Sequence, residues 1–289
     1  MPFNCQQINI AINDIRKLKA DFDAALETGK LDRSKAIQAE LENKISILQE
    51  QLVSEPIRRR ESEKLSVFFG KDVDVPPIPK PITYEQFKYW EQMGFELHYL
   101  PAEEMTQDKN FPGWIKKPDQ WFYDEIKEGN IVADATTLKG EWVLIDGRPK
   151  PDYRNGDGMY ANDPLKSTLV NLRRVGAISG YKHPSSRLNV THNELQSESL
   201  KIAFARVLHT LPEKLSLLRF IEWNFIGNVH HPEWGNNDLG EWFQDNYASI
   251  HFRLGGGGSA GGGLSYARHS SPDLPIDELG FRLLIRFSN

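Results

Sequence analysis

The cluster of prolines between residues 76 and 81 constrains the folding of this chain more than any other sequence feature. Four of these six residues, Pro76, Pro77, Pro79 and Pro81, are prolines. Proline lacks the amide hydrogen that a helix or a central strand needs, and it restricts the residue before it, so this stretch must run extended. The sequence therefore predicts an N-terminal part at residues 1–64, a proline-rich linker at 65–81 and a domain at 82–289.

The N-terminal part has the apolar periodicity of amphipathic helices. Gly29 lies in a turn-forming segment between two series of apolar residues that recur every three or four positions. This spacing predicts a helical hairpin or coiled coil. Two helices cannot bury their apolar stripes alone, so we expect packing on the rest of the chain or self-association through residues 5–62, as in a spacer or oligomerisation stalk. The two series are Ile8, Ile12, Ile15, Leu18, Phe22 and Leu26, and Ile37, Leu41, Ile45, Leu48 and Leu52.

The part of the chain after the linker mixes helices with short strands. Thr83 and Thr191 begin segments of capping-box form, and Asp163-Pro164 is a typical helix start. Residues 142–145 have the composition of a strand, and in 281–287 apolar residues alternate with arginines, as expected for a strand with two different faces. The predicted fold class is α+β, with the helical hairpin preceding a mixed domain.

Charge and composition exclude several classes of function. The net charge is −5, and the basic cluster at residues 58–60 is flanked by glutamates. We expect that cluster to be a solvated helix face and predict no nucleic-acid partner, because a phosphate-binding surface usually carries a basic stripe. No segment has the roughly 18 consecutive apolar residues of a membrane span, and the first residues lack a secretory signal pattern. The compartment therefore stays open, with the cytoplasm as the default expectation.

The single cysteine and the histidines limit the possible metal sites. Cys5 is the only cysteine, which rules out an intrachain disulfide and a zinc site built on several thiolates. His230 and His231 are followed by Glu233, but adjacent side chains on an extended chain point apart. A structural turn beside Trp234 is therefore favoured over a metal site in this segment.

Two glycine-containing segments were candidates for ion binding, and neither fits. Residues 152–158 place Arg154 where a calcium loop needs an oxygen ligand. The glycine-rich run at 255–263 is followed by neither a lysine nor a helical pattern, so we expect it to allow close approach of backbone segments rather than to bind phosphate. Because no catalytic triad motif is present either, the sequence predicts no catalytic residue, no metal and no cofactor.

An ordered set of residues in the C-terminal region resembles a known signature. Glu241-Trp242 is followed by Asp245, by Arg253 with the glycine run, by Arg268 and finally by Gly280-Phe281-Arg282. This order is similar to that of the C-type lectin fold in its formylglycine-generating-enzyme-like branch, whose pattern is E-W-x-x-D, R-G-G-S, a later arginine and G-F-R. Leu254 separates Arg253 from the glycines here. The resemblance implies a C-type lectin-like domain over residues 82–289.

The branch contains both enzymes and binding proteins. Its sulfatase-modifying enzymes use a cysteine pair within this domain, which holds no cysteine here, so the resemblance implies the fold without that chemistry. The whole chain is most similar to the variable proteins of diversity-generating retroelements, in which an error-prone reverse transcriptase rewrites codons of ligand-contacting residues. The resemblance thus implies a ligand-binding protein, with a hypervariable region at about 240–289 and an unknown protein or surface ligand as partner. An enzyme of the formylglycine type with different chemistry, or a fixed phage or surface structural protein, stays open.

The resemblance also divides the C-terminal residues into two roles. The implied scaffold has aromatic side chains in the core, glycines at tight crossings and arginines buried against carboxylates or carbonyl groups. It consists of Glu241, Trp242, Arg253, Gly257, Gly258, Gly280, Phe281 and Arg282. The remaining positions would present the ligand-binding side chains, since tyrosine and arginine anchor interfaces while serine and asparagine adapt to them. These are Asn246, Ala248, Ser249, His251, Ala260, Tyr266, Arg268, His269, Ser270, Ser271, Leu274 and Ile276, of which Arg268 also fits a scaffold role.

Overall fold

The structure is a computed structural model that describes residues 5–79, 82–149, 160, 162–248 and 251–287. The chain divides into two compact units, which are described separately. The first contains residues 1–62 and 74–80, and the second contains residues 63–73 and 81–289. Helices and strands are both abundant, so the predicted fold class α+β is confirmed.

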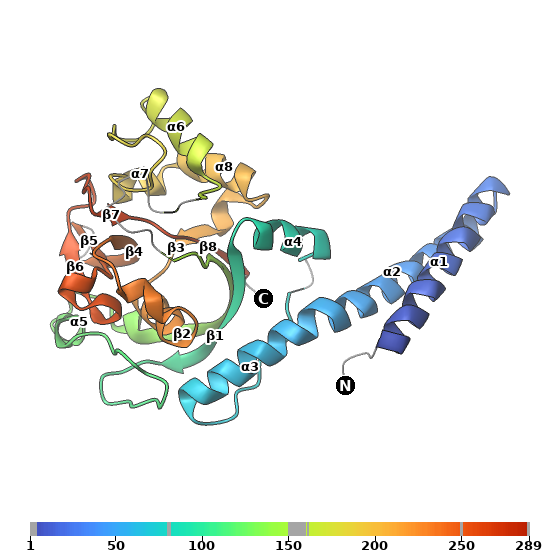
Figure 1. The fold of residues 1–289 in the computed structure, drawn as a ribbon, viewed down its shortest axis with the longest axis horizontal. Helices are drawn as coiled ribbons and strands as arrows, with labels where there is room; N and C mark the ends of the chain where they lie inside the picture. The colour runs from blue at the N-terminus through green and yellow to red at the C-terminus, as the bar shows by residue number, and fades with distance from the viewer. Residues whose placement is uncertain (1–4, 80–81, 150–159, 161, 249–250, 288–289) are drawn as a thin grey trace. The chain divides into compact units, whose positions relative to one another are not determined.

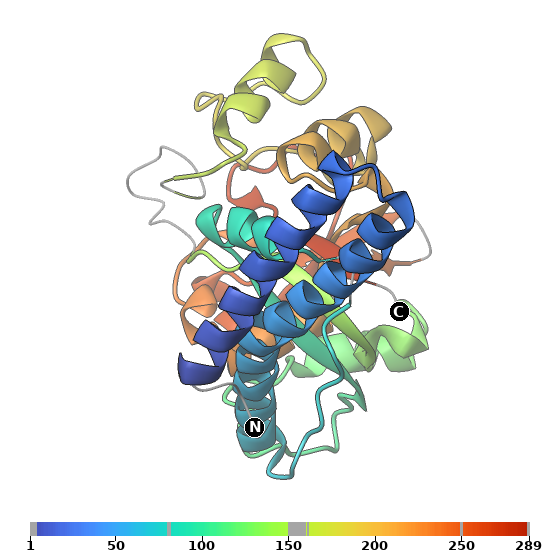
Figure 2. The ribbon, with the colours of Figure 1, turned by 90° about the vertical axis from the view of Figure 1, so that its right-hand side faces the viewer.

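The first unit is built on a helical hairpin, as the periodicity predicts. Helix α1 (Cys5–Glu27) lies beside α2 (Leu31–Gln49), and Figures 1 and 2 show the pair from two directions. Gly29 has a φ of +68° in the turn between them, a conformation that glycine adopts without strain. Lys44 Nζ lies 3.1 Å from Asp14 Oδ2 across the two helices. Ile10 and Ile47 remain 55% and 47% exposed, so the hairpin keeps apolar surface uncovered.

The helical part continues further than the sequence suggested. A π-helical turn (Glu50–Ser54) leads into α3 (Glu55–Phe69), which ends at Gly70 with a φ of +67°. Residues 65–69 therefore belong to a helix and not to the linker, because Leu65, Phe68 and Phe69 are buried in the core of the second unit. Residues 71–79 contain neither helix nor strand, as the prolines require.

In the basic cluster at residues 58–60, Arg59 and Arg60 are exposed, as expected for a solvated helix face, whereas Arg58 is half-buried. The guanidinium of Arg58 donates to the carbonyl oxygen of Val75 at 3.1 and 3.0 Å and also pairs with Glu55. Arg60 pairs with Glu61 at 3.1 Å. Through these hydrogen bonds to Val75, Arg58 holds the proline-containing segment 74–79 against α3 inside the first unit.

The second unit contains two four-stranded sheets (Figure 1). In the first sheet the order is β1 (Phe95–Glu104), β2 (Thr137–Asp146), β8 (Leu283–Phe287) and β3 (Leu215–Leu217), and every neighbouring pair is antiparallel. In the second sheet the order is β6 (Ala267–Ser270), β5 (Phe252–Gly256), β4 (Gly240–Tyr247) and β7 (Leu279–Gly280), with β4 and β7 parallel. The strands predicted at 142–145 and 281–287 are present, the second beginning at Leu283.

The alternation expected in the last strand is only partly observed. Leu283 and Leu284 point to opposite faces of β8, and both are buried, so the strand is covered on both faces. Along its edges β8 pairs with β2 and β3. Arg286 is half-buried and pairs with Glu222 at 2.9 Å, which satisfies a charge that a solvated face would leave to water.

Six α-helices accompany the sheets in the described residues of the second unit after residue 82. Thr83 caps α4 (Tyr84–Gln92), and Thr191 forms the predicted capping box at α7 (His192–Gln196). Asp119 caps α5 through the amide of Phe122. Asp163 was expected to cap a helix beginning at Pro164, but α6 begins at Lys166, and Asp163 instead accepts a hydrogen bond from the amide of Leu165 at 2.9 Å in the turn before the helix. The remaining bounds are α5 (Gln120–Lys127), α6 (Lys166–Arg174), α8 (Glu198–Val207) and α9 (Phe220–Val229).

Helix α9 forms the centre of the core. All residues from 220 to 228 are buried, and the ring of Trp223 packs 5.6 Å from that of Phe243 on β4. The buried side chain of Asn224 accepts a hydrogen bond from Trp114 Nε1 at 2.9 Å and donates to the carbonyl oxygens of Lys116 and Leu264. Since buried polar groups are costly unless they are paired, these bonds fix the glycine-rich loop near Leu264 against the core.

Candidate ligand-binding surface

The glycine-rich run allows backbone segments to approach closely, as expected. A Cβ atom at Gly256 would clash with the carbonyl oxygen of Tyr266 on the neighbouring segment, and one at Gly258 would lie 2.9 Å from the carbonyl oxygen of Asp238. At Gly263, where φ is +66°, a Cβ would lie 2.5 Å from the carbonyl oxygen of Gly235. Side chains at these positions would push β5 and the following loop away from their neighbours.

Most of the implied scaffold residues are buried. Arg282 and Glu241 are each 1% exposed and form a bidentate pair, with Nη2–Oε1 at 2.8 Å and Nε–Oε2 at 3.1 Å. Arg282 also donates to the carbonyl oxygens of Asp146 and Arg148. Trp242 donates to the carbonyl oxygen of Val190 at 2.9 Å. Phe281 packs on Phe204, and Gly257, Gly258 and Gly280 are buried as well.

Arg253 differs from the other scaffold residues. It was expected to be buried against a carboxylate or carbonyl group, but it is only half-buried, and its guanidinium donates to the carbonyl oxygen of Phe252 at 3.0 Å. The reason is its place near the outer end of β5, where it pairs in register with the exposed Asn246 and with Ser270. Its partial burial lowers the pKa of its guanidinium.

A second buried ion network was not predicted from the sequence. Arg187 is fully buried, with Nε 2.6 Å from Asp163 Oδ2 and Nη2 2.8 Å from Asp146 Oδ2. Burial alone would raise the pKa of Asp146, but the guanidiniums of Arg187 and Arg148 outweigh it and hold that pKa below its usual range. Because Arg282 donates to the carbonyl oxygen of Asp146, this network and the Arg282–Glu241 pair are connected, and they link β2 of the first sheet to β4 of the second.

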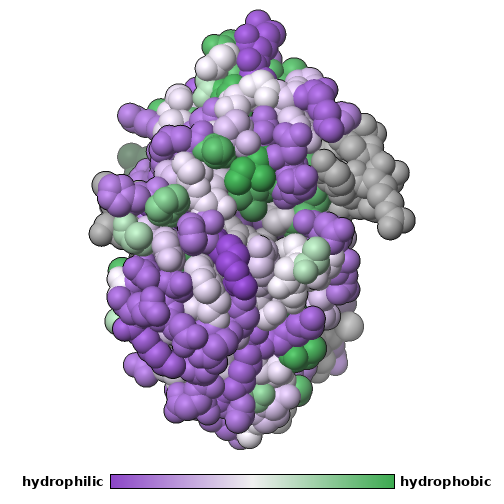
Figure 3. Space-filling view, turned by 90° about the vertical axis from the view of Figure 1, so that its left-hand side faces the viewer, coloured by the Kyte–Doolittle hydropathy of each residue, from purple (hydrophilic) through white to green (hydrophobic). Residues whose placement is uncertain are grey.

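None of the proposed ligand-binding residues that the structure describes is fully buried. Asn246, His251, Ala260, His269 and Leu274 are exposed. Half-buried positions are Ala248, Tyr266, Arg268, Ser270, Ser271 and Ile276. Ser249 lies outside the described residues, as does the segment 152–158 considered for calcium. Figure 3 shows the side on which β5 and β6 lie in Figure 1, where hydrophobic residues form small groups separated by hydrophilic ones.

An aromatic patch, defined as Trp121, Tyr247, Phe252 and His269, occupies the ends of β4, β5 and β6. The rings of Tyr247 and His269 stack with centroids 4.4 Å apart and planes 13° apart, and Phe252 meets His269 at 5.2 Å. Trp121, from α5, stacks on Tyr247 at 5.8 Å. Phe252 is 36% exposed. Of these four residues only His269 was expected, although the aromatic pair flanking the β4–β5 turn was visible in the sequence.

Arg268 links the aromatic patch to the glycine-rich loop. Its guanidinium carbon lies 4.8 Å from the ring centroid of Trp121 and 4.9 Å from that of Tyr266, within the range of cation–π attraction. Nη1 lies 2.6 Å from Asp119 Oδ2. Its two expected roles, ligand contact and scaffold, are therefore both compatible with its contacts.

The remaining candidates belong to a different part of the surface. Leu274 and Ile276 lie on the loop that follows β6, and this loop contacts residues 189–193. The amide of Asn193 donates to the carbonyl oxygen of Pro272 at 3.1 Å, and that of Asn189 to Ile276 at 3.3 Å. The candidate positions are thus spread over the surroundings of the aromatic patch, the 3₁₀ turn Ser259–Gly261, which contains Ala260, and the loop 271–278.

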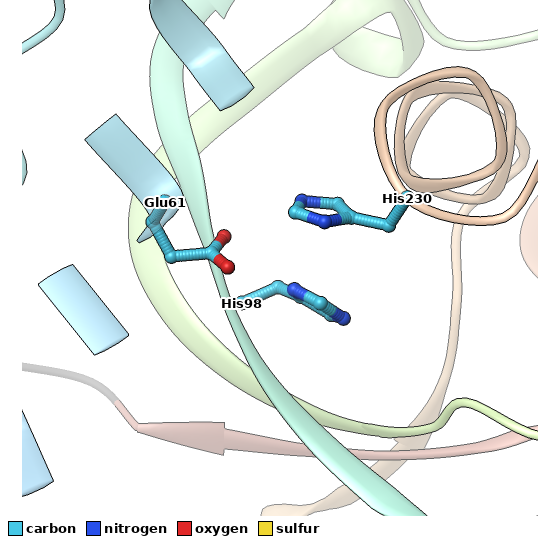
Figure 4. A group of neighbouring side chains, drawn as sticks. All are labelled: Glu61, His98 and His230. Atoms are coloured by element: carbon cyan, nitrogen blue, oxygen red, sulfur yellow. The ribbon is translucent and has the colours of Figure 1, made fainter. Parts of the chain in front are cut away.

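The histidines at 230 and 231 diverge, as expected for neighbouring residues. His231 stacks on Trp234 with centroids 4.5 Å apart and planes 3° apart, in the turn that ends as a 3₁₀ helix (Pro232–Gly235). His230 packs instead on His98 of β1 with centroids 3.9 Å apart, and Figure 4 shows these two rings facing each other. Glu61, also labelled in Figure 4, belongs to the first unit. That β1 supplies a histidine here was not predicted from the sequence.

Comparison with known protein families, with curated proteins and with solved structures finds no match to this chain. No helix in the described part of the chain is both long and apolar enough to cross a membrane.

Proposed function

We propose that this protein is a ligand-binding protein that presents variable side chains on a fixed scaffold of the C-type lectin type. The observation that carries the proposal is the division of one continuous segment by burial. Between residues 241 and 282, charged and aromatic side chains such as Glu241, Trp242 and Arg282 are buried and paired, whereas Asn246, His251 and His269 are exposed. Substitution at the second group therefore leaves the core contacts intact.

The chemistry of the aromatic patch suits recognition of a macromolecular partner. Tyrosine, tryptophan and arginine contribute most of the binding energy in many interfaces, and they lose little conformational entropy when they are already held in place. In the patch, Tyr247 is held by stacking on His269 and by its hydroxyl, which donates to Glu125 Oε2 at 3.0 Å. The half-exposed rings are thus preorganised for contact with a protein or a surface ligand.

Diversification of the gene is the finer part of the proposal and rests on the resemblance to retroelement variable proteins. Its test is deep sequencing of the coding region and its flanking DNA across a natural population. We expect substitutions concentrated in codons of residues 244–278 at adenine-templated positions, beside a near-repeat and a reverse transcriptase gene. Uniformly low variation without a template repeat would contradict diversification and leave a fixed binding protein.

Binding itself can be tested without knowledge of the natural ligand. Peptides selected from a displayed random library on the immobilised full-length protein should lose binding to the Tyr247→Ala and His269→Ala variants. The Tyr84→Ala variant is a matched control, because Tyr84 is an exposed aromatic residue on α4, outside the patch. Failure to enrich any peptide, or equal loss of binding in the control, would argue against the patch as the recognition surface.

A further inference from the structure

Three side chains from two distant segments converge beside the turn that follows α9. Glu96 and His98 are two residues apart on β1, so their side chains leave the strand on the same face. His231 follows α9 and precedes the 3₁₀ turn Pro232–Gly235. Glu96 Oε2 lies 3.3 Å from His98 Nε2 and 3.4 Å from His231 Nε2. The ligand atoms of the three residues all lie within 4.8 Å of one another.

The two separations between Glu96 and the histidines match the ligand spacing of a tetrahedral metal ion. With bonds of about 2.0–2.1 Å to nitrogen and oxygen, neighbouring ligands of tetrahedral zinc lie about 3.3–3.4 Å apart. A six-coordinate ion with bonds of the same length would bring neighbouring ligands to about 3.0 Å. Both measured distances are also longer than the usual 2.7–3.2 Å of an N–H···O hydrogen bond. The two Nε2 atoms are buried and turned toward the same carboxylate oxygen, so this spacing can accommodate a shared ion.

The surroundings of His231 orient it as a metal ligand. Its Nδ1 lies 3.0 Å from Glu233 Oε1 while its Nε2 faces Glu96, so both ring nitrogens face carboxylates. A neutral imidazole has one N–H and can donate to only one of them. If Nδ1 donates to Glu233, the lone pair of Nε2 points into the cluster, which is the carboxylate–histidine–metal arrangement of many metal sites. The side chain is only 10% exposed, and its stacking on Trp234 fixes the plane of the ring.

We propose that Glu96, His98 and His231 bind a divalent metal ion of the zinc type. Two imidazole nitrogens and one carboxylate oxygen are the donors that zinc takes in three-ligand sites. The group contains no fourth member within the described residues, and Glu96 is 43% exposed, so water completes the tetrahedron. The ion connects β1 to the segment after α9, and Glu233 acts as a positioning residue through His231. This site is independent of the proposed ligand-binding surface.

The test is metal binding by the purified full-length protein. After chelator treatment and desalting, the protein is titrated with Zn²⁺ and with Co²⁺, with elemental analysis for stoichiometry and visible absorption of bound cobalt for geometry. We expect one ion per chain and a tetrahedral cobalt spectrum. The Glu96→Gln and His231→Gln variants should bind at least tenfold more weakly, and Glu233→Gln about 10–100-fold more weakly with unchanged stoichiometry.

The His269→Gln variant is the matched control, since it removes an imidazole from the aromatic patch and should bind metal like the wild type. Circular dichroism verifies that each variant is folded. If the histidine variant unfolds, the Glu96→Gln variant decides the outcome, because the Glu96 side chain is partly exposed and its replacement should disturb the fold less. The proposal is overturned by folded wild-type protein that retains no ion, by an octahedral cobalt spectrum, or by Glu96→Gln and His231→Gln variants that bind as tightly as the wild type.

Discussion

Arg282 and Arg268 belong to the same C-terminal segment, yet their surroundings are opposite. Arg282 is 1% exposed and forms a bidentate ion pair with Glu241. Arg268 is 41% exposed, pairs with a single oxygen of Asp119 and lies against aromatic rings. A buried charge that loses its partner is strongly destabilising, but an exposed pair contributes little. Two arginines that are close in sequence can therefore differ completely in role, one supporting the fold and the other remaining available to a ligand.

The largest effect is expected for removal of the buried carboxylate. The Glu241→Gln variant leaves the Arg282 guanidinium buried without its countercharge and should lower the free energy of unfolding by about 3–5 kcal/mol. All seven tryptophans lie in the second unit, so tryptophan fluorescence during urea titration follows that unit. The Asp119→Asn variant, which removes the partner of Arg268, should cost less than about 1 kcal/mol. Equal losses in the two variants would erase the distinction between the arginines.

A methyl group in the glycine-rich run should have the next largest effect. In the Gly256→Ala variant the new Cβ clashes with the carbonyl oxygen of Tyr266, so β5 and β6 must separate, at about 1–3 kcal/mol. Gly180 offers a control, because its added Cβ would meet nothing within 4 Å. Urea titrations of both variants would be compared. If Gly180→Ala were as destabilising as Gly256→Ala, close backbone approach would not explain the glycines.

The pH dependence of stability gives a smaller and more specific test. Burial raises the pKa of Asp245 to about 7, although the amide of Phe220 donates to it. The folded protein therefore keeps a proton that the unfolded chain loses near pH 4. Its contribution to the unfolding free energy falls as the pH rises from about 4 to about 7, by at most about 1.4 kcal/mol per pH unit.

His192 has the opposite dependence. Burial lowers its pKa to about 4, so its contribution to stability is lost as the pH falls from about 6.5 to 4.

The contribution of Asp245 is isolated by the difference in unfolding free energy between the Asp245→Asn variant and the wild type. We expect the variant to gain stability relative to the wild type as the pH rises from 4 to 7, measured by urea titration at each pH. The exposed Asp277→Asn variant is the control, and a constant difference for Asp245→Asn would contradict the assignment.

The smallest effect is expected at the exposed positions. Replacing Asn246, His251, Ala260 and Leu274 singly by serine should change the free energy of unfolding by no more than about 0.5 kcal/mol each, because none is in the core. The four changes combined should remain nearly additive. Thermal and urea unfolding of the combined variant measure this tolerance. A loss as large as that of Glu241→Gln would mean that these residues support the fold.

Local features were predictable from the sequence and long-range partners were not. The caps at Thr83 and Thr191 and the strand at 142–145 depend on neighbouring residues, so their patterns could be interpreted directly. Strand β1 was missed because residues 95–104 lack regular alternation and are buried by partners elsewhere in the chain.

The same reason applies to the sites. His98 joins His231, and Trp121 joins Tyr247, only through the tertiary fold. Arg187 meets Asp146 and Asp163 across loops whose geometry no sequence spacing encodes. By contrast, the resemblance implied that Arg282 is buried against a carboxylate or a carbonyl group, although it did not name Glu241 as the partner. The close approach of backbone segments at the glycines was expected from the density of the glycine run.

The position of β8 between β2 and β3 has a consequence for synthesis of the chain on the ribosome. The first sheet lacks one of its two central strands until residues 283–287 have been translated, and by then every proposed ligand-binding position from 246 to 276 has already been translated. A premature stop or a frameshift between residues 246 and 276 therefore removes β8, the strand that connects β3 to β2 in the first sheet. Only messages with an intact reading frame through residue 287 complete the first sheet, so completion of this sheet depends on correct translation of the segment that carries the proposed ligand-binding positions.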